Sequence, residues 1–387
     1  MKKSKAIDPI FLTDFIYMLE DPRKDRTKKH ELGTIVIIAI CAVVSGAKSW
    51  VAIEDYGNAK LEFFEKLFEL NNGIPSHDTF RRLFMILKPE KLLEVFIAWV
   101  STLTEGVDLK QVCIDGKTLR RSRDENKNAI HMINAWCTGA GISLGQMKSD
   151  GKANEIKTIP KLLDLLDIEN TIVTADAMNC QVEIAKKIID KKADYLLCLK
   201  DNQPSLHERV EEKFNELSLP GRKSFEYDVF EEMQKKKHGR IENRTIRVIS
   251  AKENKSLGIN PLKKWPELKS IIEISVERID PKTGEIKIDK RHFISSLIAD
   301  AKAFAQSVRN HWQVENNLHW VLDVVFREDD CRCRAESSAE NFAVIRQFAL
   351  NLLKSESTKI SINRKQLRSG WDEKFLLQVL TGKNLDA

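Results

Sequence analysis

The chain has 387 residues, of which 42% are hydrophobic and 31% are charged. This length suffices for two or three domains of roughly 100–200 residues each, and the hydrophobic content permits a sizeable core. The 63 basic and 57 acidic residues leave a net charge of +6. That excess does not indicate a nucleic-acid partner by itself, because the placement of the basic residues matters more.

Seven cysteines are scattered without a pairing pattern, which predicts a reducing, cytoplasmic compartment. Cys331 and Cys333 form a lone C-x-C, and a zinc site needs about four ligands, so a metal site is not favoured there. The start MKKSKAIDPIF is not a secretory signal. The most apolar run, IVIIAICAVV, is shorter than the roughly 20 residues of a membrane span and predicts a buried helix.

Residues 1–105 have helical periodicity and predict an all-helical N-terminal domain that binds DNA. A long buried helix is expected to loosen at Ser45-Gly46. In GIPSHDTFRRLF, Ser76 is placed to cap a helix whose early turns carry Arg81 and Arg82. That helix could enter a DNA groove or grip phosphates; the alternative is a bundle helix with solvated arginines.

Residues 106–355 predict a second domain, in which short apolar strands alternate with amphipathic helices. The expected order is β-β-β-α-β-α-β. The first strand is KQVCIDG, the next two form a hairpin that turns at Gly139–Gly141, and the fourth lies in ENTIVTADAMNC.

The pattern changes again after the seventh of these elements. Residues 205–300 alternate as four further strands and predict a β-rich insertion, with a turn at Pro281-Lys282-Thr283-Gly284. DAKAFAQSVRNHWQVENNLHWVLDVVF is then expected to be helical. Ser337-x-x-Glu340 is a capping-box pattern that opens a last strong helix, and residues 356–387 are expected to be a C-terminal tail.

Two aspartates end predicted strands. Asp115 follows VCI and Asp176 follows IVTA. A carboxylate at the end of a buried strand opens into a crevice, so the two converge if their strands are neighbours. Converging carboxylates repel unless protons or cations neutralise them, and Mg²⁺ prefers such oxygen ligands. The alternative, for each residue alone, is a turn residue or a helix cap.

A third acid is expected on the helix that contains HWQVENNLHWVLDVVF. His311, Glu315, His319 and Asp323 follow at intervals of four and form one stripe of a helix. Burying Glu315 without a partner would be costly. We therefore expect either a metal ion or the two histidines beside it. We expect the histidines to orient Glu315 or to contact phosphate; direct metal ligation is the alternative.

Trp312 and Trp320 lie eight residues apart in the same stretch. Tryptophans at helical spacing usually belong to a core, so we expect them to pack this helix against the sheet. The alternative is stacking on a flipped base.

Basic side chains cluster beside the predicted acids and on the predicted insertion. Arginine suits bidentate phosphate binding, and Arg240 and Arg244 share one strand face. In each case the alternative is a solvated loop, an exposed strand end or a charged edge strand. The residues expected to contact DNA are Arg81, Arg82, Lys117, Arg120, Arg121, Lys200, His238, Arg240, Arg244, Arg309, His311, His319, Arg327, Arg332 and Arg334.

Five segments in order resemble the ISAs1-type insertion-sequence transposases, which include the H-repeat-associated proteins. They are IDGKTLRRS, TADAMNCQ, YLLCLKDNQ, HGRIENR and HWQVENNLHWVLDVVFREDDCRCR. GIPSHDTFRRLF resembles the helical domain that precedes the catalytic domain in that family. The resemblance covers residues 8–355 and implies a DDE transposase related to the IS4-like group.

The resemblance implies an α/β fold, in which an RNase H-like mixed sheet flanked by helices carries a β-rich insertion and follows an N-terminal all-helical domain. The matching motifs make Asp115, Asp176 and Glu315 the catalytic and metal-binding residues. The wider group's Tyr, Arg and Lys around the glutamate are absent, because Val308, His311 and Leu322 stand at those positions.

The implied cofactor is a pair of Mg²⁺ ions, with Mn²⁺ as a substitute. The implied partner is double-stranded DNA, at transposon ends and target, bound by a homodimer or larger assembly without a membrane. The implied location is the bacterial cytoplasm, with nucleoid association when DNA is bound. Two alternatives stay open: a transposase-derived DNA-binding protein without transposition activity, and an RNase H-like nuclease that cuts without joining.

Overall fold

The computed structural model describes residues 9–122, 129–217, 227–237, 240–250, 264–298 and 300–381, without the side chains of residues 9–11, 27, 234–237 and 240. The chain divides into two compact units. Unit 1 comprises residues 1–108, 116–154 and 315–387, and unit 2 comprises residues 109–115 and 155–314. In the described ranges, no helix is both long and apolar enough to cross a membrane.

The N-terminal part of unit 1 is helical, as expected. Its helices are α1 (Pro9–Ile16), α2 (Leu32–Val44), α3 (Trp50–Ala59), α4 (Leu61–Glu65), α5 (His77–Ile86) and α6 (Pro89–Thr104). Every residue of α2 is buried. The helix ends before Gly46, whose φ of +97° is incompatible with a right-handed helix. A separate domain ending at residue 105 stays a prediction, because unit 1 joins these helices to later segments.

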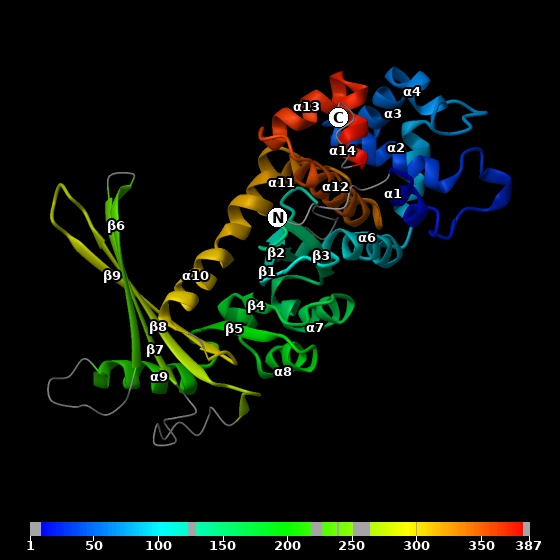
Figure 1. Ribbon diagram of the computed structural model, residues 1–387. Coiled ribbons are helices and arrows are strands. Elements are labelled where there is room, and N and C mark those ends of the chain that lie inside the picture. The colour runs from blue at the N-terminus through cyan, green and yellow to red at the C-terminus, as the bar shows by residue number, and fades with distance from the viewer. Residues whose placement is uncertain are drawn as a thin grey trace. The chain divides into compact units, whose positions relative to one another are not determined.

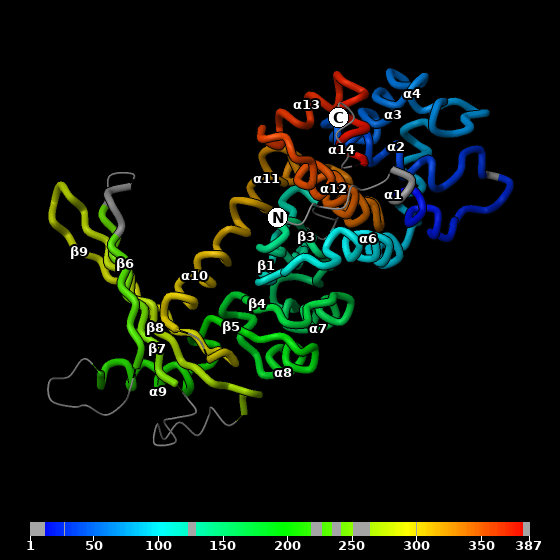
Figure 2. Tube along the Cα trace, in the orientation of Figure 1, coloured from blue at the N-terminus to red at the C-terminus, as the bar shows by residue number. Residues whose placement is uncertain are grey.

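The centre of unit 1 is α12 (Ser338–Ser355), which packs on α2, α5 and α6 although it lies far from them in the sequence (Figure 2). The Phe348 ring lies 4.9 Å from that of Phe96 and 5.2 Å from that of Trp99. Residues 356–381, expected only as a tail, form α13 (Ile362–Trp371) and α14 (Glu373–Thr381), which also pack on α12.

The predicted hairpin of unit 1 is confirmed. Strands β2 (His131–Cys137) and β3 (Ile142–Ser149) are antiparallel, and Gly141 in their turn has a φ of +70°. The end of strand β1 (Gln111–Thr118) adjoins β2, where Thr118 Oγ1 lies 2.9 Å from His131 Nδ1. Gln347 of α12 donates to Asn134 and Gln146 on the hairpin, both at 2.9 Å, so buried amides connect α12 to the hairpin.

Unit 2 is built on a mixed sheet in the order β1-β4-β5-β9-β8-β7-β6 (Figure 1). The start of β1 pairs in parallel with β4 (Ile172–Ala175), and β4 with β5 (Asp194–Leu199). The remaining strands, which are antiparallel, are β9 (Ile286–Ser295), β8 (Ser270–Ile279), β7 (Arg240–Ser250) and β6 (Tyr227–Lys237). The helices of this unit are α7 (Glu155–Leu165), α8 (Val182–Asp190), α9 (Pro204–Leu217) and α10 (Ala301–His311).

The order β-β-β-α-β-α-β and the four later strands agree with the sequence analysis. The β-rich segment continues the same sheet, because β9 pairs with β5. Helix α9 was not predicted. Its sequence, PSLHERVEEKFNEL, is largely polar, and Leu206, Val210 and Phe214 are its only buried residues.

The capping box predicted at Ser337 and Glu340 is not formed. Helix α12 begins at Ser338, and the Ser337 side chain makes no capping hydrogen bond; its ψ is 1°, whereas an N-cap residue is usually extended. Glu340 lies mostly buried instead. Burial raises its pKa to about 7, with Lys148 opposing and Glu90 and Asp150 adding to the shift.

We expect Glu340→Gln to stabilise the protein at pH 8 but not at pH 4.5. The folded-state pKa is above the unfolded one, so the folded state binds the extra proton and its stability declines as pH rises from about 4.5 to 7. The gain at pH 8 should be on the order of 1–2 kcal/mol. Unfolding midpoints at the two pH values measure it, with exposed Glu62→Gln as the control. Equal shifts at both pH values would contradict the assignment.

Candidate active site

Asp115 and Asp176 stand at neighbouring positions of unit 2. In the parallel pairing of β1 with β4, Ile114 lies opposite Ala175, so the residues that follow are the two aspartates. Asp115 is half-buried and Asp176 is exposed. The sheet therefore brings the two aspartates together. Asp176 follows the end of β4, as predicted, whereas β1 continues past Asp115 to Thr118.

Helix α10 places His311 beside Asp176. His311 Nε2 lies 3.5 Å from Asp176 Oδ1, and its Nδ1 lies 2.9 Å from Thr174 Oγ1. Burial opposes the charged ring, but the Asp176 carboxylate and the Cys113 thiol outweigh it and raise the pKa of His311 to about 10. His311 is thus a cationic neighbour of an acid in the structure, whereas we expected it to orient Glu315 or contact phosphate.

Gln111 fixes this helix against the sheet. Its Nε2 donates to the Ser307 carbonyl at 2.9 Å and to Thr174 Oγ1 at 3.2 Å, and Asn310 Nδ2 lies 3.3 Å from its Oε1. The sequence analysis did not identify Gln111 or Thr174. Each is a polar residue within an apolar run, and this feature could have identified them, because a buried polar side chain usually has a specific hydrogen-bond partner.

Glu315 and His319 form a pair within unit 1. His319 Nδ1 lies 3.2 Å from Glu315 Oε2; the histidine side chain is 6% exposed and the glutamate side chain 66%. Residues Glu315–His319 form a π-helical turn before α11 (Trp320–Val324), so the predicted continuous α-helix is interrupted. Such a turn holds one residue more than an α-turn and occurs frequently at functional sites.

The two tryptophans are not core residues. Trp312 and Trp320 are each 53% exposed, which contradicts the expected packing role. The guanidinium of Arg291 lies 5.0 Å from the Trp312 ring. In unit 2, Trp312 lines a pocket of about 210 Å³ together with Arg244 and Arg309.

Lys117 lies in a buried cluster of charges in unit 1. Its ammonium is paired with Asp323 and, at 2.5 Å, with Glu328, and its side chain is 8% exposed. Glu328 also faces Arg346 at 3.7 Å. Burial opposes both charges, yet the opposite charges nearby raise the pKa of Lys117 and lower that of Glu328. Lys117 is therefore enclosed by protein and does not present its charge to DNA, which corrects our expectation.

The partners of Lys117 were not identified from the sequence. Asp323 was assigned to the stripe with Glu315, and Glu328 begins the acidic run EDD. The EDD run could have indicated the partners of Lys117, since three adjacent acids in a chain with a nearby basic motif favour ion pairing.

The other predicted basic residues of unit 1 are exposed, and several face this acidic run. Arg120 lies 3.2 Å from Asp329, and Arg121 lies 3.3 Å from Asp330. Arg327 is also exposed and lies 3.6 Å from Asp330. Arg332 and Arg334 are exposed, and Arg334 donates to the Arg121 carbonyl at 3.0 Å. On α5, the exposed Arg81 and Arg82 lie 3.7 and 3.8 Å from Asp78.

In unit 2, the predicted basic residues vary in their exposure and pairing. Lys200 is exposed after the end of β5. Arg244 lies 2.5 Å from Glu242, and Arg309 is paired with Glu232. His238 and the side chain of Arg240 lie outside the described residues.

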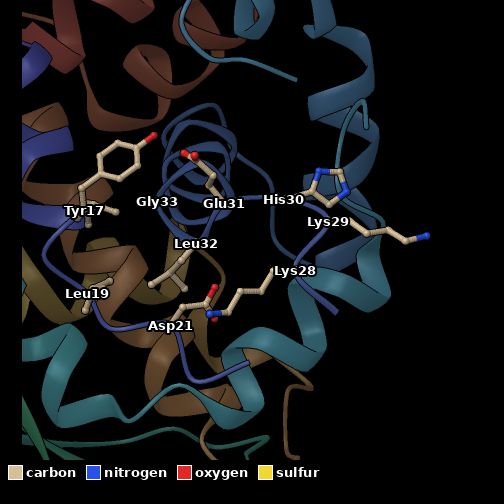
Figure 3. A pocket seen from close by; sticks show the side chains of 10 residues that line it. Tyr17, Leu19, Asp21, Lys28, Lys29, His30, Glu31, Leu32 and Gly33 are labelled. Carbon is tan, nitrogen blue, oxygen red and sulfur yellow. The ribbon is translucent and has the colours of Figure 1, made fainter. Parts of the chain in front are cut away.

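A separate pocket of about 360 Å³ lies among the N-terminal helices of unit 1. Figure 3 shows Tyr17, Lys28 and Glu31 among the side chains around it. None of the predicted site residues lines this pocket, so it is not part of the candidate active site.

Two family models together match most of the chain. The DDE_Tnp_1-associated family matches residues 13–100, and the transposase DDE domain matches residues 108–352. The second match contains β1, β4 and the π-helical turn, and so all three predicted acids.

Relatives in Escherichia coli match at full length. The H repeat-associated candidate transposase YhhI of strain K12 is 39% identical over 97% of this chain and 98% of its own. The candidate transposase YncI of strain O157:H7 is 38% identical over 95% of this chain and 94% of its own. A piggyBac transposase synaptic complex with hairpin DNA is similar in structure at a TM-score of 0.38 and 11% identity, over 99% of this chain and 83% of that one. By its family matches and its full-length relatives, this chain belongs to the DDE transposase family.

Proposed function

We propose that this protein is an active transposase of the ISAs1 type, which cuts transposon ends and joins them to target DNA in a divalent-metal-dependent reaction. Asp115, Asp176 and Glu315 are its catalytic acids. The observation that carries the proposal is the parallel register of β1 and β4, which makes the two aspartates neighbours at one edge of the sheet.

Glu315 supplies the third carboxylate in this proposal. The support comes from contacts within unit 1, where Lys117 is bonded to Asp323. Asp115 precedes Lys117 by two residues, so both lie on one face of β1. Glu315 precedes Asp323 by eight residues, or about two helical turns. The ion pair thus holds β1 and α11 together in unit 1, and Glu315 begins the turn that precedes α11.

The donor set suits a divalent cation. Carboxylate oxygens are the ligands of Mg²⁺ and Mn²⁺, and His319, bonded to Glu315, adds an imidazole that Mn²⁺ accepts more readily than Mg²⁺. Bound ions would activate water and stabilise the leaving oxygen. Among the protein's own groups, His311 orients the Asp176 carboxylate and His319 orients Glu315.

The proposed catalytic core is RNase H-like. Its support is the strand order, β3-β2-β1 in unit 1 and β1-β4-β5 in unit 2, with β2 and β3 antiparallel and the pairs β1-β4 and β4-β5 parallel. Double-stranded DNA is the proposed substrate, and a homodimer is proposed because two ends must be brought together. The proposed phosphate contacts are Arg81, Arg82, Arg120, Arg121, Lys200, Arg327, Arg332 and Arg334, all of them exposed.

Asp115→Asn should retain DNA binding and lose Mg²⁺-dependent cleavage by more than about 100-fold, since a carboxamide is a poor ligand for the activating cation. The substrate is a labelled duplex that carries the DNA sequence flanking the gene. Asp115→Cys should regain cleavage in Mn²⁺ but not in Mg²⁺, because thiolate favours the softer ion.

The matched control for this test is Asp190→Asn, an exposed aspartate at the end of α8. Full cleavage by Asp115→Asn would refute the assignment. Two other results would favour the alternatives: binding by the unmodified protein without cleavage in either metal would indicate a DNA-binding relic, and cleavage without joining would indicate a nuclease.

Lys117→Met should destabilise the protein by about 3–5 kcal/mol, because it leaves Asp323 and Glu328 without their shared cation. Denaturant unfolding measures the change. Adding Glu328→Gln should recover part of the loss, since the buried anion is then removed. A single variant as stable as the parent would show that Lys117 does not hold this cluster together.

Trp320→Ala should weaken DNA binding by about 1–3 kcal/mol, and Trp320→Phe by less, if its exposed ring stacks on a base. Fluorescence anisotropy with the same duplex measures both. Met18→Ala, which truncates an exposed apolar side chain outside the predicted site, is the matched control. Equal affinity of the Ala variant and the parent would remove Trp320 from the DNA-contact set.

A further inference from the structure

Helix α13 buries polar side chains and exposes large apolar ones, the reverse of the usual arrangement. Its buried residues are polar, namely Lys365, Gln366 and Ser369. Its exposed residues include Leu367 at 44% and Trp371 at 76% exposure. The helix lies beyond residue 352, where the transposase DDE match ends, and no role has been assigned to it above.

The inward side chains explain why the helix faces this way. Lys365 Nζ donates to the carbonyls of Leu353 at 2.9 Å and Glu356 at 2.5 Å, and Gln366 Nε2 donates to the carbonyl of Val43 at 3.3 Å. These carbonyls lie at the C-terminal ends of α12 and α2, where the regular helical hydrogen bonds stop. The Val43 carbonyl also accepts from the Gly46 amide at 3.1 Å. The polar residues are needed inside, so Leu367 and Trp371 are turned outward.

The outward face of α13 carries a net positive charge. Arg364, Leu367, Arg368 and Trp371 share this face, because residues three or four apart on a helix lie on the same side. Arg368 lies 3.8 Å from Asp372. Neither Arg364 nor the exposed Lys359 and Lys374 is paired with a carboxylate in the described part of the chain.

The acids nearby are already engaged. Glu356 is buried and lies 3.0 Å from Lys365, and Glu373 lies 3.2 Å from Lys60 of unit 1. The exposed charge between residues 356 and 381 is thus mainly basic, which suits a polyanion. Two copies of this face would repel each other, so the charge disfavours self-association through it.

We propose that the outward face of α13 is a second DNA-contact surface of this transposase, which binds the phosphate backbone of a duplex. Arg364 and Arg368 bind phosphates, for which the guanidinium fork is suited. Trp371 and Leu367 pack on the adjoining sugars. The contact is independent of base sequence, because none of it requires a base edge. The inference rests on the proposed function for its partner and concerns no catalytic residue.

The test is the double variant Arg364→Gln/Arg368→Gln, compared with the full-length parent by fluorescence anisotropy. One probe is a labelled duplex with the DNA sequence that flanks the gene, and the other is a duplex of unrelated sequence. We expect affinity to fall about tenfold on both, and the slope of log affinity against log salt to fall by about 1.8 for two lost phosphate contacts. Arg364→Lys/Arg368→Lys should lose less than about threefold, because charge is kept.

The matched control is Lys157→Gln/Lys161→Gln, two exposed lysines at the same spacing on α7. Binding is measured without divalent metal, so the result does not depend on the catalytic acids. Unchanged affinity of the Gln variant, or an equal loss in the control, overturns the proposal. So does a lower mass by light scattering with unchanged DNA affinity, which would make the face a protein interface.

Discussion

The parallel pairing of β1 with β4 is the constraint on which the candidate site depends. The paired segments, residues 111–114 of β1 and 172–175 of β4, are mostly buried, and an aspartate follows each of them directly. Parallel strands in register present equivalent ends at one edge, so the two carboxylates become neighbours without any loop having to position them. The Gln111 and Thr174 side chains then hold α10 against the same strands, which places His311 beside Asp176.

A cluster of buried charges in unit 1 holds β1 together with segments that lie far from it in the sequence. Lys117 is on β1, Asp323 on α11 and Glu328 in the following loop, and one ammonium joins all three. Charges are costly to bury unless they are paired in good geometry. Moving β1 away would separate Asp323 from Lys117 and leave Glu328 facing Arg346 alone. The cost is justified where reacting groups must be held closely, because small misplacements reduce rates steeply.

Much of the fold followed from local patterns. Alternating apolar residues predicted the hairpin β2–β3, apolar runs predicted β1, β4 and β5, and uninterrupted hydrophobicity predicted α2 as a buried helix. Helix α9 was missed because only a narrow stripe of it is buried. The capping box at Ser337 was wrong because a cap depends on the backbone conformation of that residue, which the residue type alone does not set.

The sequence by itself determined that an aspartate follows each of two apolar runs and that both aspartates lie in family motifs, because these features depend on residue order alone. Tertiary structure decided what each group faces. It buried Lys117 between two acids, paired His319 with Glu315 and His311 with Asp176, and left Trp312 and Trp320 exposed where periodicity indicated a core. Partners far apart in the chain and a π-helical turn within a regular pattern arise from packing, and no local spacing encodes them.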